Sequence, residues 1–94
     1  MAVVIVNDIA GGDQDMYDAV SPRTLPDGRL PHGCSLRLAS PIDGGWRVIT
    51  VWESEEQFEE FRNETLIPAI QEAGYADRVT PKADVRPLYE LITS

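Results

Sequence analysis

The sequence predicts an α+β fold made of four β-strands and two α-helices. Short β-branched runs stand near both ends of the chain, and two apolar runs in the middle are separated by the turn signal Asp43-Gly44-Gly45. Two further segments have apolar residues at helical spacing, and each follows a residue able to cap a helix. At 94 residues the chain has the length of one domain, which we expect to span residues 1–94.

The first strand and the first helix follow from local residue choice. Ala2–Ile9 is rich in β-branched residues and predicts a strand, which Gly11-Gly12 ends. Asp13 can cap a helix over Gln14–Val20, and Ser21-Pro22 ends that helix because the residue before a proline disfavours helical backbone.

The middle of the chain predicts a β-hairpin. A loop over 22–31 holds three prolines and both signs of charge, which indicates ordered irregular backbone. Strands are expected from about Gly33 to Ser40 and from Trp46 to Glu53, joined by the turn at residues 43–45.

The second helix and the last strand complete the order. Ser54 can cap the helix, and Gln57 completes a capping box with it. Pro68 either kinks this helix or starts a new short one, and Gly74 stops it. The last strand is expected from about Ala83 to Ile92. The helix carries apolar residues at Phe58, Phe61, Leu66 and Ile70.

The resulting order, β-α-β-β-α-β, is the ferredoxin-like arrangement, in which helices cover one face of an antiparallel sheet. The uncovered face would then be polar. The third strand contradicts this, because both of its faces are apolar: Ile49 and Val51 on one, Trp46, Val48 and Trp52 on the other. We therefore expect a homodimer in which the second copy covers the bare face.

Hairpin pairing predicts which side chains share a face. It sets Leu36 opposite Val51, Leu38 opposite Ile49, Arg37 opposite Thr50 and Ser35 opposite Trp52. The first two pairs are aliphatic, and we expect them to lie under the helices. The other two pairs are then expected to line a cavity between the sheets of two protomers, since a dry interface does not readily accept an arginine.

Composition excludes several classes of partner and cofactor. The net charge is −8, which argues against nucleic acid and anionic membrane surfaces. One cysteine, Cys34, and no long apolar run or signal peptide predict a cytoplasmic protein without disulfides. One histidine and one cysteine do not form a zinc or haem ligand set, so we expect no metal and no cofactor. Seven of the eight basic residues are arginine, as is common in GC-rich bacterial genomes.

The chain resembles the dimeric α+β barrel superfamily through its whole element order. The resemblance is strongest in Gly45-Trp46, in Val51-Trp52-Glu53-Ser54, and in the Phe58, Phe61 and Leu66-Ile67-Pro68 positions that follow. This pattern is similar to small bacterial proteins described as like antibiotic-biosynthesis monooxygenases. The resemblance implies the fold and the dimer, but the superfamily hosts several reactions on one scaffold.

Arg37 departs from the pattern of these relatives. They often have a histidine four residues after the glycine that opens the second strand, and here Arg37 stands at that position. A guanidinium stays protonated and is no general base, but it can hold a carboxylate, phenolate or enolate.

The candidate site residues fall into two groups, and each has a structural alternative. The catalytic candidates are Arg37, His32 and Asn7. The substrate-binding candidates are Trp52, Trp46, Thr50, Ser35, Tyr17 and Tyr89. The alternative for the two tryptophans and Tyr17 is core packing. For His32 it is an exposed loop position, and for Asn7 a backbone contact at the strand end.

Three functions are compatible with these residues. The first is a small-molecule enzyme, as a cofactor-independent monooxygenase on an aromatic or polyketide-like substrate or, as an alternative, a polyketide cyclase or isomerase. The second is a non-catalytic ligand-binding or stress-associated dimer. The third is an accessory protein that binds another enzyme through the acidic helix surface at Glu56 and Glu60.

Overall fold

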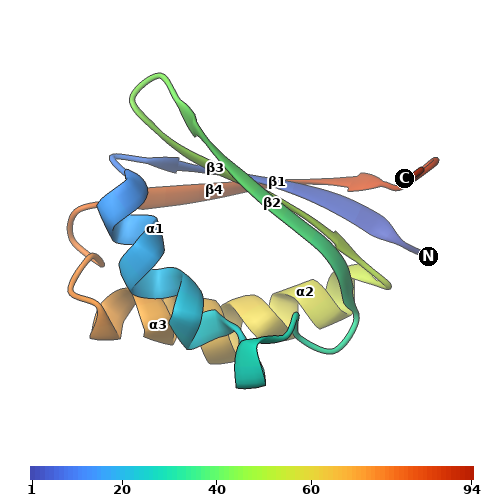
Figure 1. The fold of residues 1–94 in the computed structure, drawn as a ribbon, viewed down its shortest axis with the longest axis horizontal. Helices are drawn as coiled ribbons and strands as arrows, with labels where there is room; N and C mark the ends of the chain where they lie inside the picture. Colours follow the sequence, from blue (N-terminus) through green and yellow to red (C-terminus); the bar gives the residue numbers. More distant parts are fainter.

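Four antiparallel strands form one sheet, and the helices lie on one of its faces (Figure 1). The computed structural model describes residues 1–94, and the strands are ordered β2-β3-β1-β4 in the sheet. The strands are β1 (Val3–Ala10), β2 (Cys34–Ile42), β3 (Gly45–Trp52) and β4 (Thr80–Pro87). The helices are α1 (Gln14–Val20), α2 (Glu55–Phe61) and α3 (Ile67–Glu72). The predicted ferredoxin-like α+β fold is confirmed.

The hairpin of β2 and β3 has the predicted register over most of its length. Arg37 pairs with Thr50, and the aliphatic pairs Leu36–Val51 and Leu38–Ile49 also form. Its two-residue turn is Asp43-Gly44, where Gly44 has φ 75°, a conformation that glycine adopts at little cost. The predicted pairing of Ser35 with Trp52 is wrong. An irregularity between Cys34 and Leu36 places Cys34 opposite Trp52 instead.

Both predicted helix caps are present. The Asp13 carboxylate accepts the Met16 backbone N–H at 2.8 Å, and the Ser54 hydroxyl accepts that of Gln57 at 3.2 Å. The second helical segment is continuous from Glu55 to Glu72, with a π-helical turn over Arg62–Leu66 between α2 and α3. Pro68 lies in the first turn of α3, directly after the π-helical turn, which is the position that the second of the two expected alternatives gave it.

The predicted position of the last strand, Ala83–Ile92, is wrong at both ends. The strand starts at Thr80 because β4 is the edge strand next to β1, where Pro81 is tolerated without a donor N–H. It ends at Pro87, and beyond it the Leu88 backbone N–H still donates to the Ala2 carbonyl at 2.9 Å. The remaining C-terminal residues form no helix or strand.

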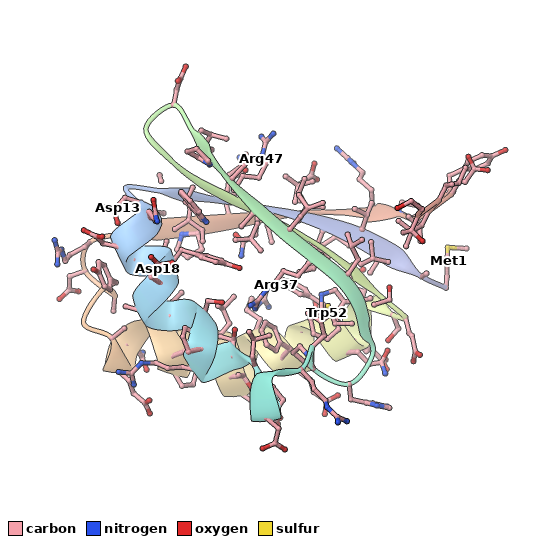
Figure 2. All side chains as sticks on the ribbon, viewed as in Figure 1. Met1, Asp13, Asp18, Arg37, Arg47 and Trp52 are labelled. Atoms are coloured by element: carbon pink, nitrogen blue, oxygen red, sulfur yellow. The ribbon has the colours of Figure 1, made fainter.

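The predicted assignment of the two sheet faces is also wrong. The helices cover the face that carries Arg37, Thr50 and Trp52, while Leu38 on the other face is 47% exposed. Figure 2 shows Arg37 and Trp52 between the sheet and the helices, and Arg47 on the opposite side of the sheet. The aliphatic pairs are therefore not under the helices.

The helices themselves explain the reversal. Phe58 and Phe61 come from the second helical segment, and their rings lie 6.0 Å and 5.1 Å from Trp52. Burying this aromatic group removes more apolar surface from water than burying the small aliphatic pairs would. Alternation along a strand predicts which side chains share a face, but it does not say which face the helices cover.

The core under the helices consists of two neighbouring clusters. One gathers Ile9, Met16, Val20 and Ile70 at the α1 end of the sheet. The other gathers Val3, Ile5, Trp52 and Phe58 at the start of α2. No helix in the structure is both long and apolar enough to cross a membrane.

Candidate functional site

An enclosed cavity of about 50 Å³ lies between the sheet and the helices. Most of the side chains that line it are hydrophobic, and they come from the sheet, from α1 and from the second helical segment. The cavity is therefore formed within one chain, and the expected position between the sheets of two protomers is wrong. The misassigned face is the reason, since Arg37 and Trp52 point toward the chain's own helices.

Arg37 enters this cavity from β2 without a carboxylate partner. Its Nη1 donates to the Thr24 hydroxyl at 2.8 Å, and its Nη2 donates to the Ser21 hydroxyl at 2.7 Å. The ring of Tyr17 lies 5.8 Å from the guanidinium carbon. The ion pairs of the structure involve Arg23, Arg47 and Arg86 instead. A cation held only by neutral groups in an apolar cavity favours an anionic ligand.

Asn7 lines the same cavity from β1. Asn7 is only 7% exposed, and its side-chain Oδ1 is buried without a hydrogen-bond partner. An unsatisfied buried acceptor costs roughly 1–3 kcal/mol. An apolar residue such as the neighbouring Ile5 or Ile9 would avoid this cost at the same strand position.

Trp52 and Thr50 form the wall between these two polar groups. Trp52 is 1% exposed, and its indole N–H donates to the Thr50 hydroxyl at 2.9 Å. Thr50 lies opposite Arg37 on one side and Ile5 on the other, so the polar side chains span three strands. Because the Thr50 oxygen already accepts from Trp52, its own O–H can donate to a ligand.

Tyr17 and Trp46 have different positions relative to the cavity. Tyr17 lines the cavity from α1, and its ring packs on Trp46 at 5.6 Å between centroids. Trp46 is not among the lining residues, and its buried Nε1 has no hydrogen-bond partner. Trp46 therefore supports Tyr17 rather than forming the wall that the sequence suggested.

Three other candidates lie away from the cavity. His32 and Ser35 are exposed, His32 before β2 and Ser35 at the irregularity near its start. Tyr89 is fully exposed in the C-terminal segment, because β4 ends before it. Among the candidates, the structure brings Arg37, Asn7, Thr50, Trp52 and Tyr17 together around one cavity.

Sequence reasoning missed several residues that the structure adds to the site. Ser21 and Thr24 belong to the segment after α1, where the prolines suggested only an irregular loop. Thr24 is 1% exposed, and its hydroxyl also donates to the Ser21 carbonyl at 2.7 Å. Their position beside Arg37 depends on a long-range contact, for which the sequence has no local signal.

Cys34 is a further lining residue that sequence reasoning did not assign to the site. Burial raises the pKa of its thiol, and hydrogen bonds to the backbone of Leu36 and Val51 and the Arg37 charge oppose this only in part. The thiol therefore stays protonated at neutral pH, so it is neither a thiolate nucleophile nor a ready base.

The acidic helix surface is separate from this cavity. Glu56, Glu59, Glu60 and Glu64 are exposed on α2 and the π-helical turn, as a solvated helix face would be. No group of three or more His, Cys, Asp or Glu side chains in the structure is arranged to hold a metal ion.

Two solved proteins share this fold across nearly the whole chain. One is SnoaB, a cofactor-independent oxygenase from Streptomyces nogalater. Its structure superposes with a TM-score of 0.66 at 15% identity, covering 99% of this chain and 98% of SnoaB. A SnoaB variant with one asparagine replaced superposes with a TM-score of 0.64. The other protein is a candidate antibiotic biosynthesis monooxygenase from Deinococcus radiodurans, with a TM-score of 0.60 at 17% identity, covering 100% of this chain and 98% of that one.

These similarities confirm the fold that the resemblance implied. At 15–17% identity they establish the fold and not the reaction. No protein-family profile and no curated protein sequence matches the chain. The reaction therefore has to be argued from the cavity itself.

Proposed function

We propose that the chain is a small-molecule enzyme that oxygenates an aromatic or polyketide-like substrate without a bound cofactor. The observation that carries the proposal is Arg37, a cation with two hydroxyl partners and no carboxylate, in a cavity walled by aromatic side chains. The same fold in SnoaB, which is a cofactor-independent oxygenase, supports it.

The proposed reaction uses the substrate as its own electron donor. A deprotonated substrate transfers one electron to O₂, and the resulting substrate radical and superoxide combine into a peroxide. The peroxide anion takes up a proton from water and then loses water together with the hydrogen of the oxygenated carbon, which leaves one oxygen atom on that carbon as a carbonyl group. Arg37 would bind the substrate anion and hold it in the cavity, and Trp52 would stack on the ring.

The cavity favours this chemistry over a cyclase or isomerase. Its titratable side chains are Tyr17, Cys34 and Arg37, and the thiol pKa of Cys34 is raised. Proton abstraction from carbon in the cavity would need a base with a pKa nearer neutrality. A substrate that is acidic enough to enter as an anion avoids that need, and Arg37 would select it.

A second candidate function is non-catalytic ligand binding. The observation that favours it is the small size of the cavity, since about 50 Å³ holds one or two water molecules at about 30 Å³ each. This candidate predicts a ligand that is bound by the protein and released unchanged.

We also propose that the chain is a homodimer through the face of the sheet opposite the helices. Leu38 is 47% exposed on that face, and Val4, Val6, Leu36 and Ile49 of the same face are only partly buried. Figure 1 shows no element over this side of the sheet. A second copy would remove the remaining apolar surface from water.

Oxygen uptake tests the enzymatic proposal. The wild-type protein is expected to consume oxygen with an activated dihydroxynaphthalene, and Arg37→Gln should lower the rate by about 10²-fold, as loss of one stabilising donor does elsewhere. Arg78→Gln, at an exposed arginine between α3 and β4 and outside the cavity, is the matched control and should keep the wild-type rate. No uptake by the wild-type protein across several such compounds, together with their unchanged recovery, would favour the binding function.

A further inference from the structure

A surface groove lies directly beside the cavity. Its volume is about 300 Å³, and it is bordered by the segment after α1 and by residues near the π-helical turn. Three side chains, Thr24, Pro31 and Phe61, line both the groove and the cavity. They are therefore the partition between the two spaces.

The volumes suggest that the two spaces work together. Sites for drug-sized molecules measure about 300–1,000 Å³, so the cavity alone holds no aromatic ring. The cavity and the groove together reach the lower end of that range. Opening the partition would give a flat molecule access to Trp52 from the surface.

Arg37 holds the partition closed from inside. Its two terminal nitrogens donate separately to Ser21 and Thr24, at 2.7 Å and 2.8 Å. Both hydroxyls belong to the segment that carries Thr24 and Pro31. On the outside, this segment is tied to α3 only by the exposed pair of Arg23 and Glu72 at 3.2 Å, which is a weak contact.

The arrangement of these donors matches a carboxylate. The two nitrogens bind two oxygens at once, and a carboxylate offers two oxygens to the same fork in a bidentate pair. A bidentate pair between two ions is stronger than the two hydrogen bonds from the guanidinium to neutral hydroxyls that it would replace. A carboxylate at Arg37 would therefore release Ser21 and Thr24, and with them the partition.

We infer that the cavity and the groove form one binding site for an aromatic carboxylate, whose carboxylate binds Arg37 in place of the Ser21 and Thr24 hydroxyls and so opens the segment Ser21–Pro31. The aromatic body lies against Trp52 and Phe61. Asn7, at the far side of the cavity, accepts a hydrogen bond from a donor group on the ring when the ligand has one. This inference rests on the proposed small-molecule function and specifies its substrate class.

Binding calorimetry with 2-naphthoate and its neutral analogue 2-naphthamide tests the inference at neutral pH. The two probes have nearly the same shape, so their difference reports the carboxylate. Wild-type protein should bind the acid at least about tenfold more tightly than the amide. Arg37→Gln should abolish this preference, and Arg78→Gln, at an exposed arginine outside the cavity, the groove and the segment Ser21–Pro31, should keep it. If Arg37→Gln does not fold, Arg37→Lys keeps the charge but loses the fork, and it should lose most of the preference.

A separate variant tests whether the hydrogen bond from Arg37 to Thr24 keeps the partition closed. Thr24→Val removes one hydroxyl partner of Arg37 with little change of shape, so it should bind 2-naphthoate several-fold faster or more tightly. Thr80→Val makes the same change at an exposed position of β4 and should bind as the wild type does.

Three results would overturn the inference: no binding of either probe to the wild-type protein, equal affinity for acid and amide, or an unchanged acid preference in both Arg37 variants. Binding is measured apart from oxygen uptake, so failure of the proposed function is distinguishable. Acid-selective binding without oxygen uptake would support the carboxylate site and reject the oxygenase function. Oxygen uptake without a preference for the acid would support the oxygenase function and reject the carboxylate site.

Discussion

Arg37 and Asn7 are polar residues inside strands that are otherwise built for burial, and each has a cost in the free energy of folding. Arg37 has two neutral partners, and the Oδ1 of Asn7 has none. Structures carry such costs at positions where a ligand supplies the missing partner more often than elsewhere. Both residues stood out in the sequence because a polar side chain interrupted an apolar run.

Asn7→Leu is expected to separate stability from binding. It removes the unsatisfied acceptor, and the two methyl groups that replace the amide are bulkier and can enter the adjoining cavity, so the free energy of unfolding should rise by about 1 kcal/mol. Affinity for an aromatic ligand should fall, since the same atoms occupy its space. Urea denaturation and calorimetry measure the two effects, and a more stable variant with unchanged binding would show that Asn7 is not part of the site.

Thr24 illustrates what the sequence could not show at the scale of a residue. Its hydroxyl matters because the chain folds back to place it 2.8 Å from Arg37, which is thirteen positions away. No periodicity or motif in the segment predicts the contact between Thr24 and Arg37. The buried threonine would be found only by placing the segment over the sheet.

At the scale of an element, the β2–β3 hairpin also shows what local sequence patterns predict and what they do not. Alternation and the Asp-Gly turn were enough to predict the pairs Leu36–Val51, Leu38–Ile49 and Arg37–Thr50. They were not enough to predict which face the helices cover, because both faces are apolar. The irregularity at Ser35 and the edge position of β4 depend on neighbouring strands, and the sequence therefore misplaced Ser35 and Tyr89.

Ser54→Ala should destabilise the protein through the N-terminus of α2. The Ser54 hydroxyl accepts the Gln57 backbone N–H, and loss of such a cap costs about 1 kcal/mol. Chemical denaturation should show a lower midpoint with an unchanged slope. Ser40→Ala, in β2 and away from any helix end, is the control; an equal loss there would argue against a capping effect.

The ion pair between Asp8 on β1 and Arg47 on β3 should make the free energy of unfolding depend on pH. The hydrogen bonds from Arg47 lower the pKa of Asp8, desolvation opposes this in part, and the charge of Arg47 lowers the pKa further. A carboxyl whose pKa is lower in the folded state stabilises the fold above its unfolded pKa. This contribution is lost as the pH falls below about 4 and the carboxylate takes up a proton.

The variant Asp8→Asn tests whether the carboxylate stabilises the fold at neutral pH and loses this effect in acid. The variant should be less stable than the wild type at pH 7, and the difference should shrink as the pH falls toward 3 in thermal melts. A difference that stays constant over this range would show that the pair with Arg47 does not account for it.

For the whole molecule, the two apolar faces of the sheet have different roles. The helix side forms the core and the cavity, and the other side exposes Leu38 with nothing over it. The sequence was sufficient to predict that both faces need burial and that two copies would satisfy this. It assigned the cavity to the wrong face, since it treated the dimer as the only source of an enclosed space.

The dimer is expected to dissociate when this open face becomes charged. Leu38→Lys should convert the protein to a monomer in light scattering, because a buried unpaired charge costs several kcal/mol. Leu30→Lys changes another exposed leucine, which lies outside the sheet, and the variant should remain dimeric. A wild-type protein that stays monomeric at every concentration would contradict the proposed dimer.

The central claim is that the cavity between the sheet and the helices binds a small organic anion through Arg37. A crystal structure of the protein with 2-naphthoate tests it most directly. The predicted result is a carboxylate about 3 Å from both terminal nitrogens of Arg37, with the ring against Trp52 and with Thr24 displaced. Ligand on the open face of the sheet, or Arg37 still bound to Ser21 and Thr24 at saturating ligand, would contradict it.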